Sequence, residues 1–304
     1  MVDSSIFFWW KIEITFFHEL EESLISQLNG LGINNYAIEL SIKNSFRQTL
    51  SAWLPSDEWS KNDRDGLQID LHCLSKSYPG EQFSIKWEKV SNKDWSSIWK
   101  KYWAPNPIGE KILILPSWLD LPAQYSNRTV LKLDPGSAFG TGSHQTTRLC
   151  LEALESFPLK GIRVADIGCG SGILGIAALR LGAKEVNAVD IDLSAVKATS
   201  ENALLNDLNQ TQLAVSLGSL DVLKMQLKNN KADLIICNTL AHVIKDLAPK
   251  FDLIGSDKSH LLLSGLLVHQ VADLTSFLSI LGWGLLASYR CDEWSLIHLC
   301  RKAS

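Results

Sequence analysis

A glycine-rich turn is the feature of this sequence whose residue types and spacing most directly predict chemistry. In Val164–Gly172, an apolar run expected as a strand enters a turn with glycine at 168, 170 and 172, and a segment expected as a helix follows. Glycine lets the backbone approach a ligand closely, and the first turn of a helix offers N–H groups without partners. We therefore predict a ligand site here. A tight turn that binds nothing is the alternative.

The charge of one side chain discriminates between two ligands for this turn. Gly170, Gly172 and Gly175 spell the G-x-G-x-x-G fingerprint of dinucleotide sites. Asp190 follows Gly170 by twenty residues, as that fingerprint requires. However, the carboxylate of Asp166, just before the glycines, would repel a pyrophosphate. It would suit the ammonium and sulfonium groups of S-adenosylmethionine. We expect S-adenosylmethionine and keep an NAD-dependent oxidoreductase as an alternative.

Asp190 occupies the end of the next predicted strand, after the apolar run Val186–Val189. A carboxylate at this place can accept hydrogen bonds from both hydroxyls of a ribose. Asp190 could instead cap the helix that begins near Leu193, but Asp192 fits the capping role better. We predict that Asp190 contacts the ligand.

Two polar side chains are expected at the same edge of the sheet. Thr147 stands in the first turn of a predicted helix, where its hydroxyl and the free amides could hold a carboxylate. Asn238 follows the buried run Leu234–Cys237 and emerges at the carboxyl edge, where ligands bind in open α/β folds. Asn238 or Thr239 could instead cap the next helix. Phe139–Gly142 is typical of a glycine-hinged loop that folds over a ligand.

These motifs together resemble a known family. Asp166, Gly168 and Asp190 resemble the cofactor-binding half of class I S-adenosylmethionine-dependent methyltransferases. Four further segments, in their order and spacing, are similar to the bacterial PrmA family, which methylates ribosomal large-subunit protein eleven: Pro116–Trp118, Leu133–Thr147, Asn238–Ala241 and Asp292–Trp294. The resemblance covers roughly residues 94 to 300, and the first third matches only in size and position. This chain departs from the family at three positions: the family usually has Ile where Thr239 stands, Thr where Ser143 stands and Pro where Gln145 stands.

The resemblance implies transfer of methyl groups from S-adenosylmethionine to lysine, or N-terminal, amino groups of a basic ribosomal protein. It implies that four residues contact the cofactor: Thr147, Gly168, Asp190 and Asn238. From the glycine turn we add Asp166 and Gly170 to these contacts. We assign catalysis to Asn238, whose side-chain oxygen would orient the amine, and we assign neither a base nor a metal. The alternative activity is a class I methyltransferase acting on another protein or on nucleic acid.

Apolar runs and helical segments alternate from about residue 128, which predicts parallel βαβ units in a doubly wound α/β sheet. Strands are expected at 163–167, 185–190, 232–237, 260–264, 283–289 and 294–299. The last two leave no room for a helix between them, so they must form a terminal antiparallel hairpin. The resemblance implies the seven-stranded sheet of the class I methyltransferases.

The first third predicts a separate, small α+β domain. Strands are expected at 7–16, 36–42 and 82–90, a helix at 18–31, and a loop within the polar stretch 54–66. Trp95, Trp99 and Trp103 lie four residues apart, on one face of a helix. We place an N-terminal substrate-recognition domain at 1–92, a linker helix at 93–105 and a catalytic domain at 106–304.

Composition and charge bound the remaining classes. The 304 residues are 46% hydrophobic, and 29 Lys and Arg face 33 Asp and Glu, as in ordinary globular proteins. No apolar run reaches the roughly 18 residues of a membrane span. Residues 1–92 hold 8 basic and 13 acidic residues, a net of −5, which favours a basic protein partner over nucleic acid. The six cysteines show no zinc pattern and the start shows no basic leader, so we expect a cytoplasmic monomer.

Overall fold

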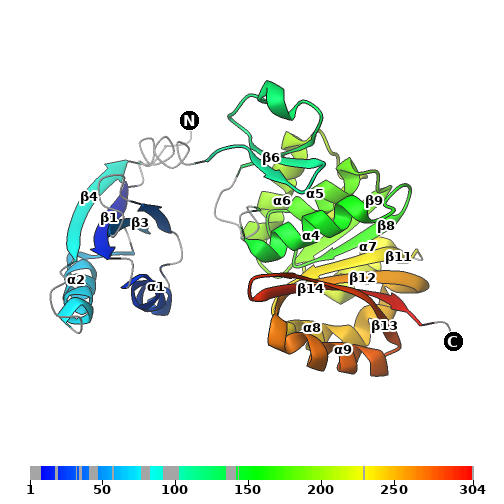
Figure 1. The fold of residues 1–304 in the computed structure, drawn as a ribbon. Helices are drawn as coiled ribbons and strands as arrows, with labels where there is room; N and C mark the ends of the chain where they lie inside the picture. Colours follow the sequence, from blue (N-terminus) through cyan, green and yellow to red (C-terminus); the bar gives the residue numbers. More distant parts are fainter. Residues whose placement is uncertain are drawn as a thin grey trace. The chain divides into compact units, whose positions relative to one another are not determined.

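The chain folds into two compact units, Met1–Trp103 and Ala104–Ser304. The computed structural model in Figure 1 describes residues 8–17, 20–31, 33, 36–40, 47–56, 58–76, 83–91, 103–134, 142, 144–228 and 230–302. The linker helix predicted at 93–105 lies outside the described residues except for its last three positions.

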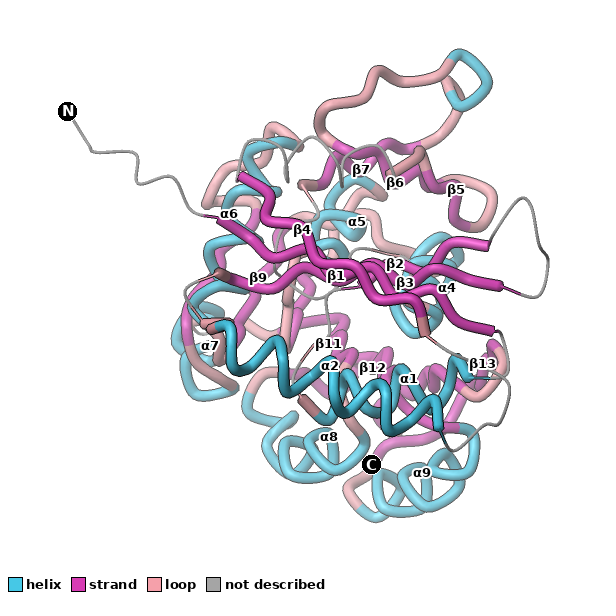
Figure 2. Tube along the Cα trace, turned by 90° about the vertical axis from the view of Figure 1, so that its left-hand side faces the viewer, coloured by secondary structure: helices cyan, strands magenta, loops and turns pink. Residues whose placement is uncertain are grey.

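The N-terminal unit is a four-stranded antiparallel sheet with two helices. The elements run β1 (Phe8–Phe17), α1 (Glu21–Gly30), β2 (Tyr36–Leu40), β3 (Arg47–Pro55), α2 (Lys61–Lys76) and β4 (Ser84–Ser91). The strand order β2-β3-β1-β4 and the β-α-β-β-α-β connectivity are those of a ferredoxin-like split βαβ fold. Both helices lie on one side of the sheet (Figure 2).

Alternation of side chains builds the core of this unit. Ile12, Ile14 and Phe16 of β1 are buried in one cluster with leucines of both helices. Helix α2 begins at Lys61, within the stretch where we predicted a loop. Asp63, Asp65 and Asp70 are exposed, while Leu67 and Leu71, one turn apart, face the core. The polar sequence therefore conceals an amphipathic helix.

The C-terminal unit, Ala104–Ser304, is built on a seven-stranded sheet with the order β10-β9-β8-β11-β12-β14-β13. The strands are β8 (Arg163–Ile167), β9 (Glu185–Asp190), β10 (Leu213–Leu217), β11 (Ala232–Asn238), β12 (Gly255–Leu267), β13 (Trp283–Cys291) and β14 (Trp294–Arg301). Strand β14 runs antiparallel to both of its neighbours, β12 and β13, and it forms the predicted terminal hairpin with β13. The predicted sheet is thus confirmed, although β10 was not located from the sequence.

Helices cover both faces of this sheet (Figure 1). One face carries α4 (Gln145–Ser156), α5 (Ile173–Arg180) and α6 (Leu193–Leu205). The other carries α7 (Leu220–Leu227), α8 (Ala241–Leu247) and α9 (Val271–Ile280), with the short 3-10 helices η3 (Ala248–Leu253) and η4 (Val268–Gln270). Two separate apolar cores result, as a doubly wound sheet requires. Among the described helices, none is long and apolar enough to cross a membrane.

A small sheet precedes the large one and was not predicted. Strands β5 (Asn106–Ile108), β6 (Ile112–Pro116) and β7 (Thr129–Leu133) lie in this order, with η2 (Ala123–Tyr125) between the last two. Glu155 of α4 anchors it, because its carboxylate accepts hydrogen bonds from the backbone N–H groups of Glu110, Lys111 and Ile112 at 3.0, 2.9 and 2.8 Å. The turn between β5 and β6 is thereby fixed to the C-terminal part of α4.

Candidate functional site

The predicted glycine turn joins β8 to α5 at the carboxyl edge of the large sheet. Gly168, Gly170 and Gly172 have φ of +71°, +55° and +79°, a region that side chains with a Cβ rarely adopt. A Cβ at Gly172 would lie 2.7 Å from Cγ2 of Thr199. A Cβ at Gly168 would meet no atom of the described residues within 4 Å, its chain neighbours aside. Gly168 therefore presents bare backbone to open space, where a ligand can approach closely.

Asp190, the last residue of β9, braces this turn. Its Oδ2 accepts a hydrogen bond from Gly170 N at 2.9 Å, and its Oδ1 accepts one from Asp192 N at 3.0 Å. The N-cap of α6 is Asp192, which accepts from Ser194 N at 2.8 Å, so the capping alternative for Asp190 is wrong. Each carboxylate oxygen has a second lone pair, so Asp190 can still accept from ribose hydroxyls.

Asp166 lies beneath the turn rather than on its surface. Its side chain is 1% exposed, and Oδ2 accepts a hydrogen bond from Gly175 N of α5 at 3.2 Å. Burial raises the pKa of this carboxyl to about 7, with a smaller contribution from the charge of Asp190, while the bond from Gly175 opposes the shift. Asp166 thus fixes the start of α5, and its direct contact with a ligand stays a prediction.

Thr147 and Asn238 meet at the carboxyl edge. Thr147, the third residue of α4, is 1% exposed. Asn238 ends β11, and its Nδ2 donates to Oγ1 of Thr147 at 3.4 Å. The N-cap of α8 is Leu240, which has no side-chain capping bond, so the geometry does not support a capping role for Asn238 or Thr239. With Nδ2 directed at Thr147, Oδ1 is the atom of Asn238 that can accept from an amine.

Strand β12 passes very close to Thr239, the residue after Asn238. Gly265 has φ of +83°, and a Cβ there would lie 2.3 Å from the backbone oxygen of Thr239. Ser264 O accepts a hydrogen bond from Thr239 N at 3.1 Å, and Ser264 Oγ donates to Ser295 O at the same distance. Sequence reasoning did not find these two residues, although a serine–glycine pair within an apolar strand is a recognisable signal for close backbone approach.

Comparisons with known proteins decide the family of this chain. The model of the family "Ribosomal protein L11 methyltransferase (PrmA)" matches residues 8–302. A ribosomal protein L11 methyltransferase of Prochlorococcus marinus (strain SARG) is 60% identical over 301 residues, 99% of each chain. That of Synechococcus sp. (strain RCC307) is 46% identical over 293 residues, 96% of this chain and 97% of the relative. The chain belongs to the PrmA family.

A solved PrmA structure agrees with this assignment. The crystal structure of a ribosomal protein L11 methylase from Lactobacillus delbrueckii subsp. bulgaricus has a TM-score of 0.60 and 33% identity, covering 66% of this chain and all of that chain. The predicted family and the predicted methyltransferase are confirmed. The extent of the resemblance was underestimated, because the PrmA match begins at residue 8 and includes the N-terminal third.

His144 is a PrmA-motif residue to which sequence reasoning gave no role. Its side chain caps α4 by accepting from Thr146 N at 3.3 Å, and its ring packs edge-on against Trp294 at 5.0 Å. Burial lowers the pKa of His144, which favours the neutral ring that this accepting role needs. Gln145 Nε2 donates to Asp292 Oδ2 at 2.6 Å. The resemblance segments around Thr147 and Asp292–Trp294 are therefore in direct contact.

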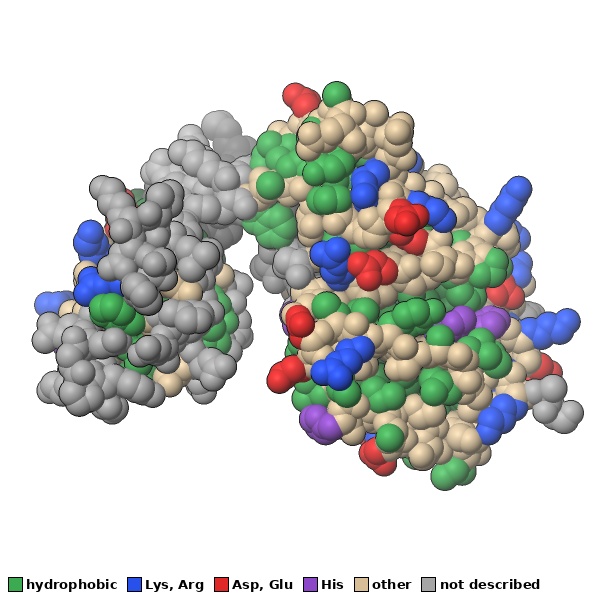
Figure 3. All heavy atoms as spheres, in the orientation of Figure 1, with side chains coloured by type: hydrophobic (Ala, Val, Ile, Leu, Met, Phe, Trp, Pro, Cys, Tyr) green, Lys and Arg blue, Asp and Glu red, His purple; other side chains and the backbone are tan. Residues whose placement is uncertain are grey.

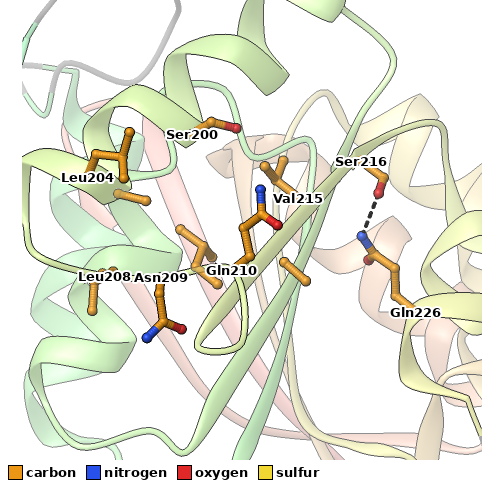
Figure 4. Close-up of a pocket in the computed structure, with 11 residues that line it drawn as sticks. Ser200, Leu204, Leu208, Asn209, Gln210, Val215, Ser216 and Gln226 are labelled. Atoms are coloured by element: carbon orange, nitrogen blue, oxygen red, sulfur yellow. Dashed lines mark hydrogen bonds between the residues drawn. The ribbon is translucent and has the colours of Figure 1, made fainter.

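A cavity of about 530 Å³ lies elsewhere in the C-terminal unit, along edge strand β10 (Figure 4). Ser200 and Leu204 of α6, Asn209 and Gln210 of the following loop, and Gln226 of α7 contribute to its lining. None of the predicted site residues lines it, so it is separate from the site above. Within the described residues, no group of three or more His, Cys, Asp or Glu is placed to hold a metal ion.

Proposed function

We propose that this chain transfers methyl groups from S-adenosylmethionine to lysine, or N-terminal, amino groups of a ribosomal protein, the counterpart of L11. Membership of the PrmA family supports this activity. The single observation that carries the proposed mechanism is the contact of Asn238 with Thr147 at the carboxyl edge, where two elements distant in sequence present an amide oxygen and a helix N-terminus together.

The residues of the site suit the proposed methyl donor. The bare backbone at Gly168 leaves room for the ligand that a side chain would fill. The carboxylate of Asp190 is held by two backbone amides at a place where it can accept from the ribose hydroxyls. Thr147, in the first turn of α4, would hold the methionine carboxylate at the positive end of the helix dipole. When bound, S-adenosylmethionine supplies a methyl group already activated by its sulfonium.

The remaining task of the protein is to prepare the amine. A lysine amine has a pKa of about 10.4, so near pH 7.5 only about one in a thousand is neutral, at a cost of roughly 4 kcal/mol. Removal from water lowers that pKa, and the proton leaves to solvent before the lone pair can react. Asn238 Oδ1 would then accept an N–H of the neutral amine and aim its lone pair. No side chain is assigned as a base.

Capture of the substrate is proposed for the N-terminal unit, with domain limits of 1–92, 93–105 and 106–304. The excess of 13 acidic over 8 basic residues in 1–92 suits a basic ribosomal protein. On the face of the C-terminal unit visible in Figure 3, basic and acidic side chains are interspersed rather than gathered into a basic surface. Direct contact with nucleic acid is therefore not part of the proposal, which describes a cytoplasmic monomer.

Labelling tests the proposed function directly. The purified chain is incubated with S-adenosylmethionine labelled on its methyl group and with separated large-subunit proteins and ribosomal RNA. We expect label in the L11 counterpart, stable to acid hydrolysis as methylated lysine or a methylated N-terminus. The Asn238→Ala variant serves as the control for contaminating activity. Label in RNA, or equal labelling by the variant, would contradict the proposal.

A further inference from the structure

Helix α6 carries a buried polar stripe that the proposed function does not use. The stripe consists of Thr199 and Asn202 of α6 and of Asn206, the C-cap that follows the helix. Their spacing of three and four residues places them on one side of it. Their exposed fractions are 0%, 1% and 0%. Burying a hydroxyl or amide costs free energy unless every polar atom finds a partner, so their bonds identify what the stripe positions.

Two members of the stripe hold the glycine turn from below. Thr199 Oγ1 donates to the carbonyl of Gly170 at 3.0 Å, and Asn202 Nδ2 donates to the carbonyl of Ser171 at 2.9 Å. Two consecutive peptide groups of the turn are thus fixed to α6. Because the N–H of Gly170 is bonded to Asp190 at the same time, the orientation of the turn is set from two sides.

Asn202 also reaches a second segment of the site. Its Oδ1 accepts from Asp134 N at 2.9 Å, at the first residue after β7 and thirteen positions before Thr147. One side-chain amide therefore links the glycine turn to the start of the segment that leads into α4. Asn206 differs, because its bonds go to Lys132 N and O at 2.9 and 2.7 Å and to Asn202 O in its own helix.

We propose that Asn202 is a positioning residue for the methyl donor: by bonding Ser171 O and Asp134 N together it holds the glycine turn ready to bind. The inference rests on the proposed function for the identity of the ligand. A turn that is already in its binding conformation loses no further conformational entropy when the ligand binds. Loss of the Asn202 bonds should therefore lower the affinity for S-adenosylmethionine. The opposite side of α6, where Ser200 and Leu204 line the cavity of Figure 4, takes no part.

The test compares Asn202→Ala with Asn206→Ala in the full chain. Both remove a buried asparagine, one within α6 and one at its C-cap, that is bonded to the region of β7, but only the first releases the glycine turn. Calorimetry with S-adenosylhomocysteine should give a Kd about tenfold higher for Asn202→Ala, and within about twofold of the parent for Asn206→Ala. Urea unfolding should show a loss of stability in both. The KM for S-adenosylmethionine should rise with the Kd, while kcat stays within about twofold.

Thr199→Val is a second variant that keeps the shape of the side chain and loses the hydroxyl, with its contacts to Gly170 O at 3.0 Å and to Cys169 Sγ at 3.3 Å. We expect a Kd about three- to fivefold higher, so the test survives if Asn202→Ala does not fold. Equal Kd values for Asn202→Ala, Thr199→Val and the parent would overturn the inference. An equal rise in Kd for Asn206→Ala and Asn202→Ala would also overturn it, because a general loss of stability would then explain both changes. A parent chain that does not bind S-adenosylhomocysteine would instead refute the proposed function.

Discussion

Asn238 and Thr147 lie 91 positions apart in the sequence, yet the amide of one donates to the hydroxyl of the other at 3.4 Å. This contact joins the end of a central strand to the first turn of α4. It leaves the amide oxygen of Asn238 for a substrate amine and ties its orientation to the residue proposed to hold the methyl donor. A single hydrogen bond thus relates the proposed sites of the two reactants.

Asn238→Ala should reduce turnover more than donor binding. The change removes the oxygen that orients the amine and leaves the glycine turn and Asp190 intact. We expect kcat to fall by about a hundredfold or more, with the Kd of S-adenosylhomocysteine changed less than about fivefold. Steady-state kinetics and calorimetry on the same preparation check this. A variant that loses affinity but keeps kcat would refute the catalytic assignment.

Asp190→Ala should weaken donor binding strongly. Charge-assisted bonds to the ribose are worth about 1.5–3 kcal/mol, so the Kd should rise roughly 10- to 150-fold. Because Asp190 also accepts from Gly170 N and Asp192 N, some loss of stability is expected as well. The matched control is Asp192→Ala, which removes the N-cap of α6 and should lower stability without changing the Kd. Equal Kd values for the two variants would contradict a ribose contact.

Asp166 should make folding stability depend on pH. Its pKa is about 7 when folded and near 3.8 without the fold, so between these values only the folded chain holds the proton. Stability from this group is therefore greatest below pH 3.8, falls as the pH rises towards 7, and is level above it. Relative to Asp166→Asn, which mimics the protonated carboxyl, the parent should lose roughly 2–3 kcal/mol between pH 5 and pH 8, at about 1.4 kcal/mol per pKa unit. Urea unfolding of the parent and of Asp166→Asn at pH 5 and pH 8 measures the free energies of unfolding. An equal change in both proteins between the two pH values would contradict the raised pKa of Asp166.

The C-terminal unit should fold and bind the methyl donor without the N-terminal unit. Its two apolar cores contain no described residue of the first unit. A chain of residues 104–304 should keep the Kd for S-adenosylhomocysteine and lose most activity on the intact ribosomal protein.

Salt gives an independent check of the N-terminal unit. Raising it from about 0.05 to 0.5 M shortens the Debye length from ~14 to ~4 Å, so capture by the whole chain should weaken. Undiminished activity of the short chain would assign another role to the first unit.

Local pattern was sufficient to predict most of the large sheet and its site. The glycine turn, Asp190 and Asn238 each follow an apolar strand, and strand ends in a parallel sheet share one edge. Helix α2 was missed because charge on its exposed side hid the spacing of its leucines.

The polar stripe of α6 could not be predicted in the same way. Asn202 is positioned by partners 31 and 68 residues away, and an asparagine within a helix gives no local sign of such bonds. Strands β5, β6 and β7 have only three to five residues each, too few for a periodic pattern to be distinctive.

The contact of Gly265 with Thr239 limits how the substrate range of this enzyme could be changed by directed evolution. Any side chain at 265 would collide with a backbone oxygen next to Asn238, in addition to its unfavourable φ, so a library at this position should yield only inactive variants. Leu240, by contrast, is 56% exposed two residues after Asn238 and makes no capping bond. A library at 240 can vary bulk and charge two residues from Asn238 without disturbing the strand that carries Asn238.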